Sequence, residues 1–180
     1  MAEFNSFANP KIETKRFKLY ADVGDAADKP VWELQGRGIE SWTVEENSDV
    51  EKTPDVLGFI DMDRGTAQPT QSGLSIKLRK GSKLGEILFD AWFRRDTSKL
   101  DAMKILQKFE FADGADKDTC LARLEEDVMI AINNFTGEAG GYLGFEIDIH
   151  YANKTTTGSM PKVDGETITF TPDTTSEATE

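Results

Sequence analysis

The stretch GYLGFEIDIHY, residues 141–151, alternates between apolar and polar side chains. Its apolar members occupy every second position: Leu143, Phe145, Ile147, Ile149 and Tyr151. Between them lie Glu146, Asp148 and His150, the last being the single histidine of the chain. A period of two predicts a β-strand with one buried face and one polar face. The polar face then raises the question of whether it forms a metal or acid–base site or is simply the solvated side of a sheet.

The same period recurs along the chain and predicts seven or eight strands, so we expect a mainly β fold. Candidate strands lie in WELQGRGIESWTV (32–44), VLGFIDM (56–62), LSIKLRK (74–80), MKILQKFEF (103–111), EDVMIAINN (126–134) and ETITFTP (166–172). The longer segment LARLEEDVMIAINNF (121–135) is ambiguous at its start, where a helical turn is also compatible with the pattern. Its second half is predicted as strand from the alternation of Val128, Ile130 and Ile132.

One segment departs from the period of two. In SKLGEILFDAWFRRD (82–96) the apolar residues follow helical spacing: Leu84, Ile87, Leu88, Ala91 and Trp92. Ser82 is a suitable N-cap, and Arg94 and Arg95 suit the C-terminal end of a helix dipole. We therefore expect one amphipathic helix that buries its apolar stripe on the flank of a sheet.

Three regions divide the chain. Residues 1–15 lack a sustained period and are expected to form an arm, residues 16–171 a single β-domain, and residues 172–180 a polar, disordered tail. Within the domain, polar stretches at 46–55, 63–73 and 152–166 are expected to be long loops, and such loops in a compact domain are usually functional.

Composition excludes several classes of protein. The 180 residues carry 33 acidic and 21 basic side chains, giving a net charge of −12, which does not suit a specific nucleic-acid reader. An acidic surface keeps a protein soluble, and it also lets DNA slide past without sticking. The single cysteine, Cys120, forms no internal disulfide, and no apolar run suggests a secretory signal or a membrane span.

The polar residues offer few candidates for catalysis. Positions i, i+2 and i+4 on a strand spread over roughly 13 Å, so Glu146, Asp148 and His150 line up rather than converge on a metal. A serine triad would have only His150 as its base, and no nucleophile-elbow sequence accompanies it. A small hydrolase or metal enzyme using these three residues stays as one alternative. A carbohydrate-binding or adhesion module with Trp32, Trp42 and Trp92 as its platform is another.

The order of elements carries a family resemblance. An arm precedes RGIESWTVEEN, two polar loops flank a short strand, LSIKLRKGS leads into the helix ending in WFRRD, and the chain closes with GGYLGFEIDIHYANKTTTGSM. This order resembles the major tail protein, or tail tube protein, of long-tailed bacteriophages that infect Gram-positive bacteria. The resemblance implies two packed antiparallel sheets in a flattened β-sandwich or barrel flanked by one helix.

The resemblance also implies a function. Copies of the chain would form hexameric rings that stack into a tail tube, with DNA passing through the lumen without specific binding. It implies a structural, non-enzymatic virion protein, needing no cofactor, that is assembled in the host cytoplasm. Its partners would be itself and other tail proteins such as the tape measure, terminator and distal tail proteins. Candidate lumen-lining residues are Glu45, Asp61, Glu146, Asp148 and His150, and candidate ring-stacking residues are Asp49, Glu51 and Lys52.

Overall fold

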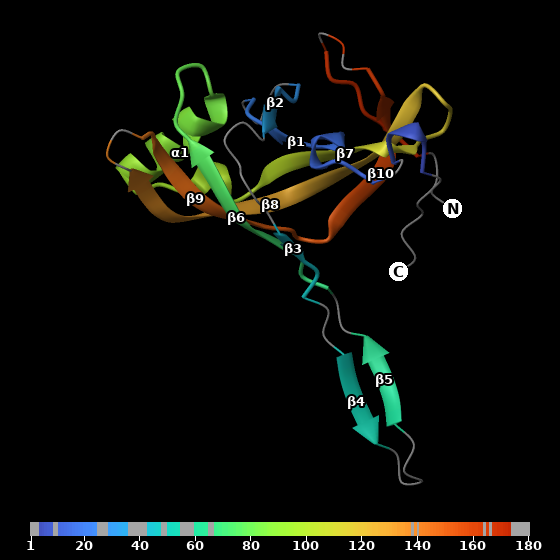
Figure 1. The fold of residues 1–180 in the computed structure, drawn as a ribbon. Helices are drawn as coiled ribbons and strands as arrows, with labels where there is room; N and C mark the ends of the chain where they lie inside the picture. The colour runs from blue at the N-terminus through green and yellow to red at the C-terminus, as the bar shows by residue number, and fades with distance from the viewer. Residues whose placement is uncertain are drawn as a thin grey trace.

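The chain forms a mainly antiparallel β-structure with one α-helix (Figure 1). This computed structural model describes residues 4–8, 11–24, 29–35, 43–47, 50–54, 60–64, 67–137, 139, 141–163, 165 and 167–173. The strands are β1 (Phe17–Asp22), β2 (Trp32–Gln35), β3 (Thr43–Glu45), β4 (Val50–Pro54), β5 (Ile60–Arg64), β6 (Thr70–Lys77), β7 (Met103–Asp113), β8 (Thr119–Gly137), β9 (Leu143–His150), β10 (Lys154–Pro161) and β11 (Thr171–Pro172). The helix is α1 (Lys83–Arg94), and short 3₁₀ turns are η1 (Ser6–Ala8), η2 (Thr14–Arg16) and η3 (Ser98–Leu100).

Nine strands share one antiparallel sheet in the order β2-β1-β7-β8-β9-β6-β3, with β10 and β11 branching from β8. The first half of β8 pairs with β7 and β10, whereas its second half pairs with β9. Because β8 belongs to both halves, the predicted sandwich is confirmed in an approximate form, as two halves of one folded sheet. The ambiguous start of 121–135 is strand throughout.

A bulge in the middle of β8 interrupts the alternation of inward-facing and outward-facing residues along this strand. Asp127 has a left-handed backbone (φ 55°), and the register against β7 shifts between Ile105↔Glu125 and Met103↔Val128. An extra residue in one strand reverses which side chains face inward. Odd residues such as Glu125 therefore face the interior before the bulge, and even residues such as Val128 face it afterwards.

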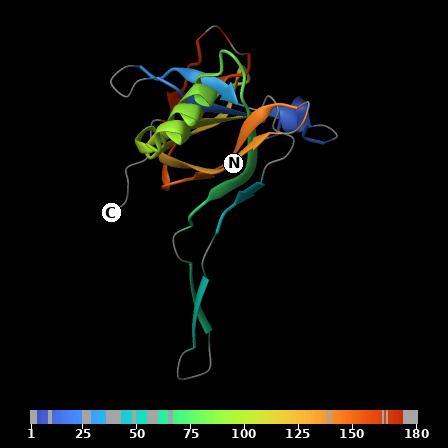
Figure 2. The same cartoon turned by 90° about the vertical axis from the view of Figure 1, so that its left-hand side faces the viewer.

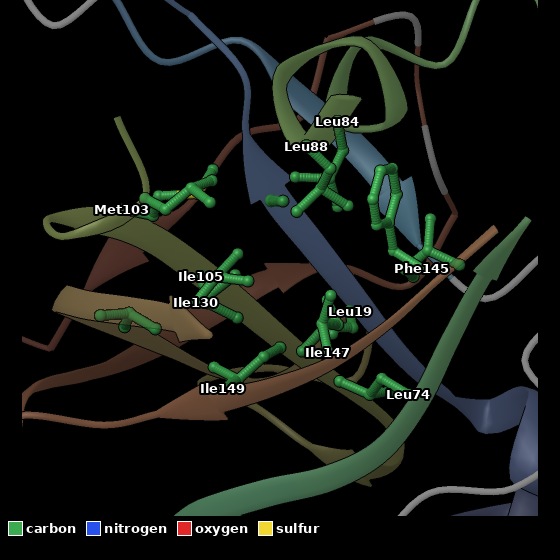
Figure 3. Close-up of a cluster of buried hydrophobic side chains, with 14 of the residues drawn as sticks. Leu19, Leu74, Leu84, Leu88, Met103, Ile105, Ile130, Phe145, Ile147 and Ile149 are labelled. Atoms are coloured by element: carbon green, nitrogen blue, oxygen red, sulfur yellow. The ribbon is translucent and has the colours of Figure 1, made fainter. Parts of the chain in front are cut away.

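The main core lies between the two halves and beneath α1 (Figure 3). Leu19 of β1, Leu74 of β6, Ile105 of β7, Ile130 of β8 and Ile147 of β9 are all buried there. The predicted helix is confirmed: Ser82 Oγ accepts a hydrogen bond from Gly85 N at 3.2 Å, and the buried residues of the helix are Leu84, Gly85, Leu88 and Ala91. No helix among the described residues is long and apolar enough to cross a membrane.

Besides the Ser82 hydroxyl, a carboxylate also holds the start of α1. Glu33 Oε2, from β2, accepts a hydrogen bond from Leu84 N at 2.8 Å. The first N–H groups of a helix lack intrahelical partners and favour negative charge nearby. Glu33 therefore connects the edge strand β2 to the N-terminus of α1.

A smaller apolar cluster covers the opposite face of the β1–β7–β8–β10 half. Its buried members are Tyr20, Leu106, Cys120, Ala122 and Met160. Ile168 and Phe170 pack against it from the C-terminal segment, where Thr171–Pro172 is the only strand among the described residues after β10. This half of the sheet is thus covered on both faces.

The N-terminal arm lies along β7 beyond the end of β1. Phe4 forms a β-bridge with Ala112, and Asn5 N donates to Phe111 O at 2.9 Å. Nearby, the buried Glu110 accepts charge-assisted contacts from Arg16 at 3.3 Å and Lys18 at 2.6 Å. Phe4 and Asn5 of the arm therefore have fixed partners on β7.

The region expected to be two long loops around a short strand is different in the structure. Strand β4 (Val50–Pro54) pairs with β5 (Ile60–Arg64) in a separate antiparallel ribbon. The ribbon extends away from the nine-stranded sheet in two perpendicular views (Figures 1 and 2). Glu51 and Lys52 lie on β4, within the stretch 46–55 expected to be a loop, whereas Asp61 lies on β5, which the predicted strand 56–62 overlaps at residues 60–62.

Candidate functional surfaces

The four strands β3, β6, β9 and β8 share a polar outer face. Glu45 lies opposite Thr70, Thr70 opposite His150, and His150 opposite Met129, so the four residues form one row across the sheet. Directly paired residues in antiparallel strands point to the same face. Because side chains alternate, Asp148 and Glu146 continue this face along β9.

The alternation predicted for residues 145–151 is confirmed by burial. Phe145, Ile147, Ile149 and Tyr151 are buried, whereas Glu146 and His150 are exposed and Asp148 is half-buried. Leu143, at the start of the strand, is the exception, being exposed beside the turn between β8 and β9.

The polar residues of β9 have separate local partners rather than a common centre. Glu146 Oε2 accepts a hydrogen bond from Asn134 Nδ2 at 2.6 Å, and His150 Nδ1 lies 3.4 Å from Thr70 Oγ1. Among the described residues, no three His, Cys, Asp or Glu side chains are grouped to hold a metal ion. These residues therefore form an open polar surface rather than a convergent site, and the carboxylates of Glu45, Glu146 and Asp148 are spread across it.

The other candidate residues lie elsewhere. Asp61 is on β5 opposite Thr53, so it belongs to the ribbon and not to the polar face of the sheet. Glu51 and Lys52 are on β4, opposite Asp63 and Met62. Asp49 lies outside the described residues.

Two of the tryptophans belong to different apolar clusters. Trp92 packs against Phe135 with ring centroids 4.5 Å apart in the main core, whereas Trp32 packs against the smaller cluster. Trp42 lies outside the described residues. Trp32 and Trp92 therefore do not form a shared flat surface of the kind that stacks on sugar rings.

A buried polar network fills one end of the space between the two sheet halves, and sequence reasoning missed it. Tyr151 Oη donates to Gln71 Oε1 at 2.7 Å and accepts from Gln107 Nε2 at 3.1 Å. Arg123 donates to Gln107 Oε1 at 2.8 Å and pairs with Glu125 at 2.7 Å. The network thus connects β6, β7 and β8 where the apolar core ends.

Four of the five residues of the network are protected from solvent, and Arg123 is partly exposed. Tyr151, Gln71, Gln107 and Glu125 are buried, and burial raises the pKa of the Tyr151 hydroxyl above its ordinary value near 10. Polar groups buried together are stabilising only when each has a partner. The only signal in the sequence was the interruption of apolar alternation at Gln107 and Lys108, which also suits a solvated strand.

Comparison with known proteins gives a likeness of fold. No family model matches the chain, and no curated protein matches it. A chain of the anti-feeding prophage cap, described as a tube-terminating cap, superposes with a TM-score of 0.50 and 14% identity, covering 83% of this chain and 92% of that one. A chain from the sheath–tube complex of an extracellular contractile injection system, in its extended state, gives a TM-score of 0.49 and 12% identity, covering 83% and 93%.

Proposed function

We propose that the chain is a structural, non-enzymatic subunit that associates with copies of itself into six-membered rings, which stack into the tube of a phage-type tail. The observation that carries the proposal is the fold similarity to the tube-terminating cap, which extends over most of both chains. The similarity concerns fold; the assembly, its symmetry and its placement in a tail of a bacteriophage are our inference, as is assembly in the host cytoplasm beside other tail proteins.

The two ends of the sheet support self-association. Within the described residues, β2 pairs only with β1, and β3 pairs only with β6, so each presents a strand edge. Unpaired edges are templates for pairing with another chain. The apolar residue Leu34 of β2 is 51% exposed, and Val31, which directly precedes β2, is 54% exposed. An apolar, open edge on one side of the subunit can then join the open edge of its neighbour.

The polar outer face suits a surface facing DNA. Glu45, Glu146 and Asp148 place carboxylates across the sheet formed by β3, β6, β9 and β8. Like charge keeps a polyanion from binding tightly within a narrow channel. We therefore assign this face to the lumen, and we assign contacts between rings to the β4–β5 ribbon with Glu51 and Lys52.

The test is assembly of the purified chain, followed by light scattering and negative-stain electron microscopy. We expect rings with a mass six times the 20.0 kDa of one chain, and stacked tubes at higher concentration. Leu34→Lys places a charge on the β2 edge and is expected to abolish assembly while leaving the monomer folded. Val163→Lys is the matched control, because Val163 is 83% exposed and lies outside β2.

The outcomes separate the alternatives. Assembly of the wild type and the Val163→Lys variant, with loss in Leu34→Lys, supports an edge-to-edge ring. A wild-type chain that stays monomeric at every concentration, even with the other tail proteins added, contradicts the tube proposal. In that case, retention on immobilised polysaccharides would favour a carbohydrate-binding module instead.

A further inference from the structure

Side-chain contacts that lie outside both apolar clusters hold the base of the β4–β5 ribbon. The ribbon leaves the sheet between β3 and β6, whose last paired residues are Glu45 and Thr70. In both overall views, the ribbon reaches well beyond the sheet from this point (Figures 1 and 2). The described residues on either side of its base are 46–47 and 67–69.

Two asparagines bridge these residues. Asn47 Nδ2 donates to Gln68 O at 3.0 Å and lies 3.4 Å from Thr70 Oγ1, joining the outgoing and returning segments. Asn153, just after β9, donates from Nδ2 to Ala67 O. Both asparagines have left-handed backbones, with φ of 45° and 60°, a conformation that costs asparagine less than most residues.

The end of β9 completes the contact. Tyr151 N donates to Pro69 O at 3.0 Å, and His150 Nδ1 lies 3.4 Å from Thr70 Oγ1. The returning segment, residues 67–70, is thereby attached to β9 and to the segment before β4. We call the contacts of Asn47 and Asn153 with this segment the ribbon clamp.

The location of the clamp points to a positioning role. Asn47 and Asn153 are exposed and lie outside both apolar clusters, so their amides add little to core packing. A projecting ribbon with a free base would sample many directions, and fixing one direction costs conformational entropy at the moment of binding. A base fixed in advance lowers that cost and strengthens binding without adding contacts.

We propose that Asn47 and Asn153 are positioning residues that direct the β4–β5 ribbon toward a second copy of this chain in the adjacent ring. This inference rests on the proposed tube function, because the partner is the neighbouring copy. The clamp acts through the direction of the ribbon, so its effect on assembly does not require a contact between either asparagine and the partner.

The test uses the double variant Asn47→Gly and Asn153→Gly in the full chain. Glycine accepts the left-handed backbone, so the change removes the two amides without backbone strain. Arg95→Gly is the matched control, since Arg95 is exposed, has φ of 60° and ends α1 far from the ribbon. Melting temperature reports folding, and the concentration at which tubes form reports assembly.

A second readout measures the ribbon in the monomer. Spin labels on Lys52→Cys in β4 and Lys99→Cys in η3 report the distribution of distances between ribbon and body, and the native Cys120 is buried. We expect the distribution to broaden at least twofold in the double-glycine variant, and the concentration for tube formation to rise about tenfold. The melting temperature and the Arg95→Gly control are expected to match the wild type.

Each outcome bears on one part of the inference. An unchanged distance distribution in the double variant overturns the clamp. A broadened distribution with an unchanged tube-forming concentration overturns its role in assembly. Failure of the wild type to assemble removes the proposed function and the partner named here, while broadening would still support the clamp as the element that directs the ribbon.

Discussion

Replacing Tyr151 by phenylalanine tests the buried polar network with the loss of one oxygen atom. The Tyr151 hydroxyl donates to Gln71 Oε1 and accepts from Gln107 Nε2, and all three side chains are buried. Tyr151→Phe leaves an amide oxygen and an amide N–H without these partners. A buried polar group left unsatisfied costs about 1–3 kcal/mol. With two groups affected, we expect the free energy of unfolding to fall by about 2–4 kcal/mol.

Urea unfolding followed by fluorescence measures this loss, with the slope of free energy against urea expected to stay constant. Tyr142→Phe is the matched control: Tyr142 is 66% exposed, and its variant should lie within about 0.5 kcal/mol of the wild type. A Tyr151→Phe variant as stable as Tyr142→Phe would refute the conclusion that the hydroxyl joins the two sheet halves.

The effect of Tyr151→Phe on the free energy of unfolding is expected to depend on pH. Burial raises the pKa of folded Tyr151 above its unfolded value near 10, so the folded chain holds this proton more tightly. The resulting stability is fully present below about pH 10 and is lost as the pH rises through the folded value. The difference in stability between the wild type and Tyr151→Phe should therefore shrink above pH 10, measured by urea unfolding between pH 8 and 11.

Three further substitutions probe local features of the fold by urea unfolding. Glu33→Ala removes the carboxylate that accepts from Leu84 N and should cost about 1 kcal/mol, whereas Glu33→Gln, which keeps an acceptor oxygen, should cost less. Asp127→Val places a β-branched residue at φ 55° and should cost about 1–2 kcal/mol, with Asp127→Gly near wild type. Gly144→Ala brings a Cβ within 2.6 Å of Ile76 O and should cost about 1–3 kcal/mol, whereas Gly165→Ala, whose nearest neighbour is 3.8 Å away, should be silent. Equal stability within any of these pairs would contradict the corresponding contact.

Sequence reasoning succeeded where local pattern and tertiary environment agree. The helix at 83–94 has a capping serine, a stripe at helical spacing and a core-facing side, so each level points to the same element. Strand β9 alternates because one face meets the main core and the other meets solvent. In both elements the residues that decide the structure are neighbours in sequence.

It failed where a distant segment changes which face is buried. Lys108 and Glu110 read as the polar side of a strand, yet the structure buries both beneath the N-terminal and C-terminal segments. Lys108 Nζ donates to Lys162 O at 3.2 Å, a contact across 54 residues that local periodicity does not encode. Strand β4 was missed for a different reason: its sequence VEKTP has no alternating apolar residues, so it was read as part of a polar loop.

The bulges determine where the interior changes from apolar to polar. Gly73, with φ of 75°, lies between Gln71 and Leu74, and Asp127 lies between Glu125 and Val128. At each bulge the inward-facing position shifts by one residue, which brings polar side chains inward on one side and apolar ones on the other. The polar network is therefore a consequence of strand register. The Tyr151 hydroxyl bonds Gln71 of β6 and Gln107 of β7, so it joins the two sheet halves. The backbone N–H of the same residue donates to Pro69 O next to the ribbon clamp, so Tyr151 also holds the base of the ribbon.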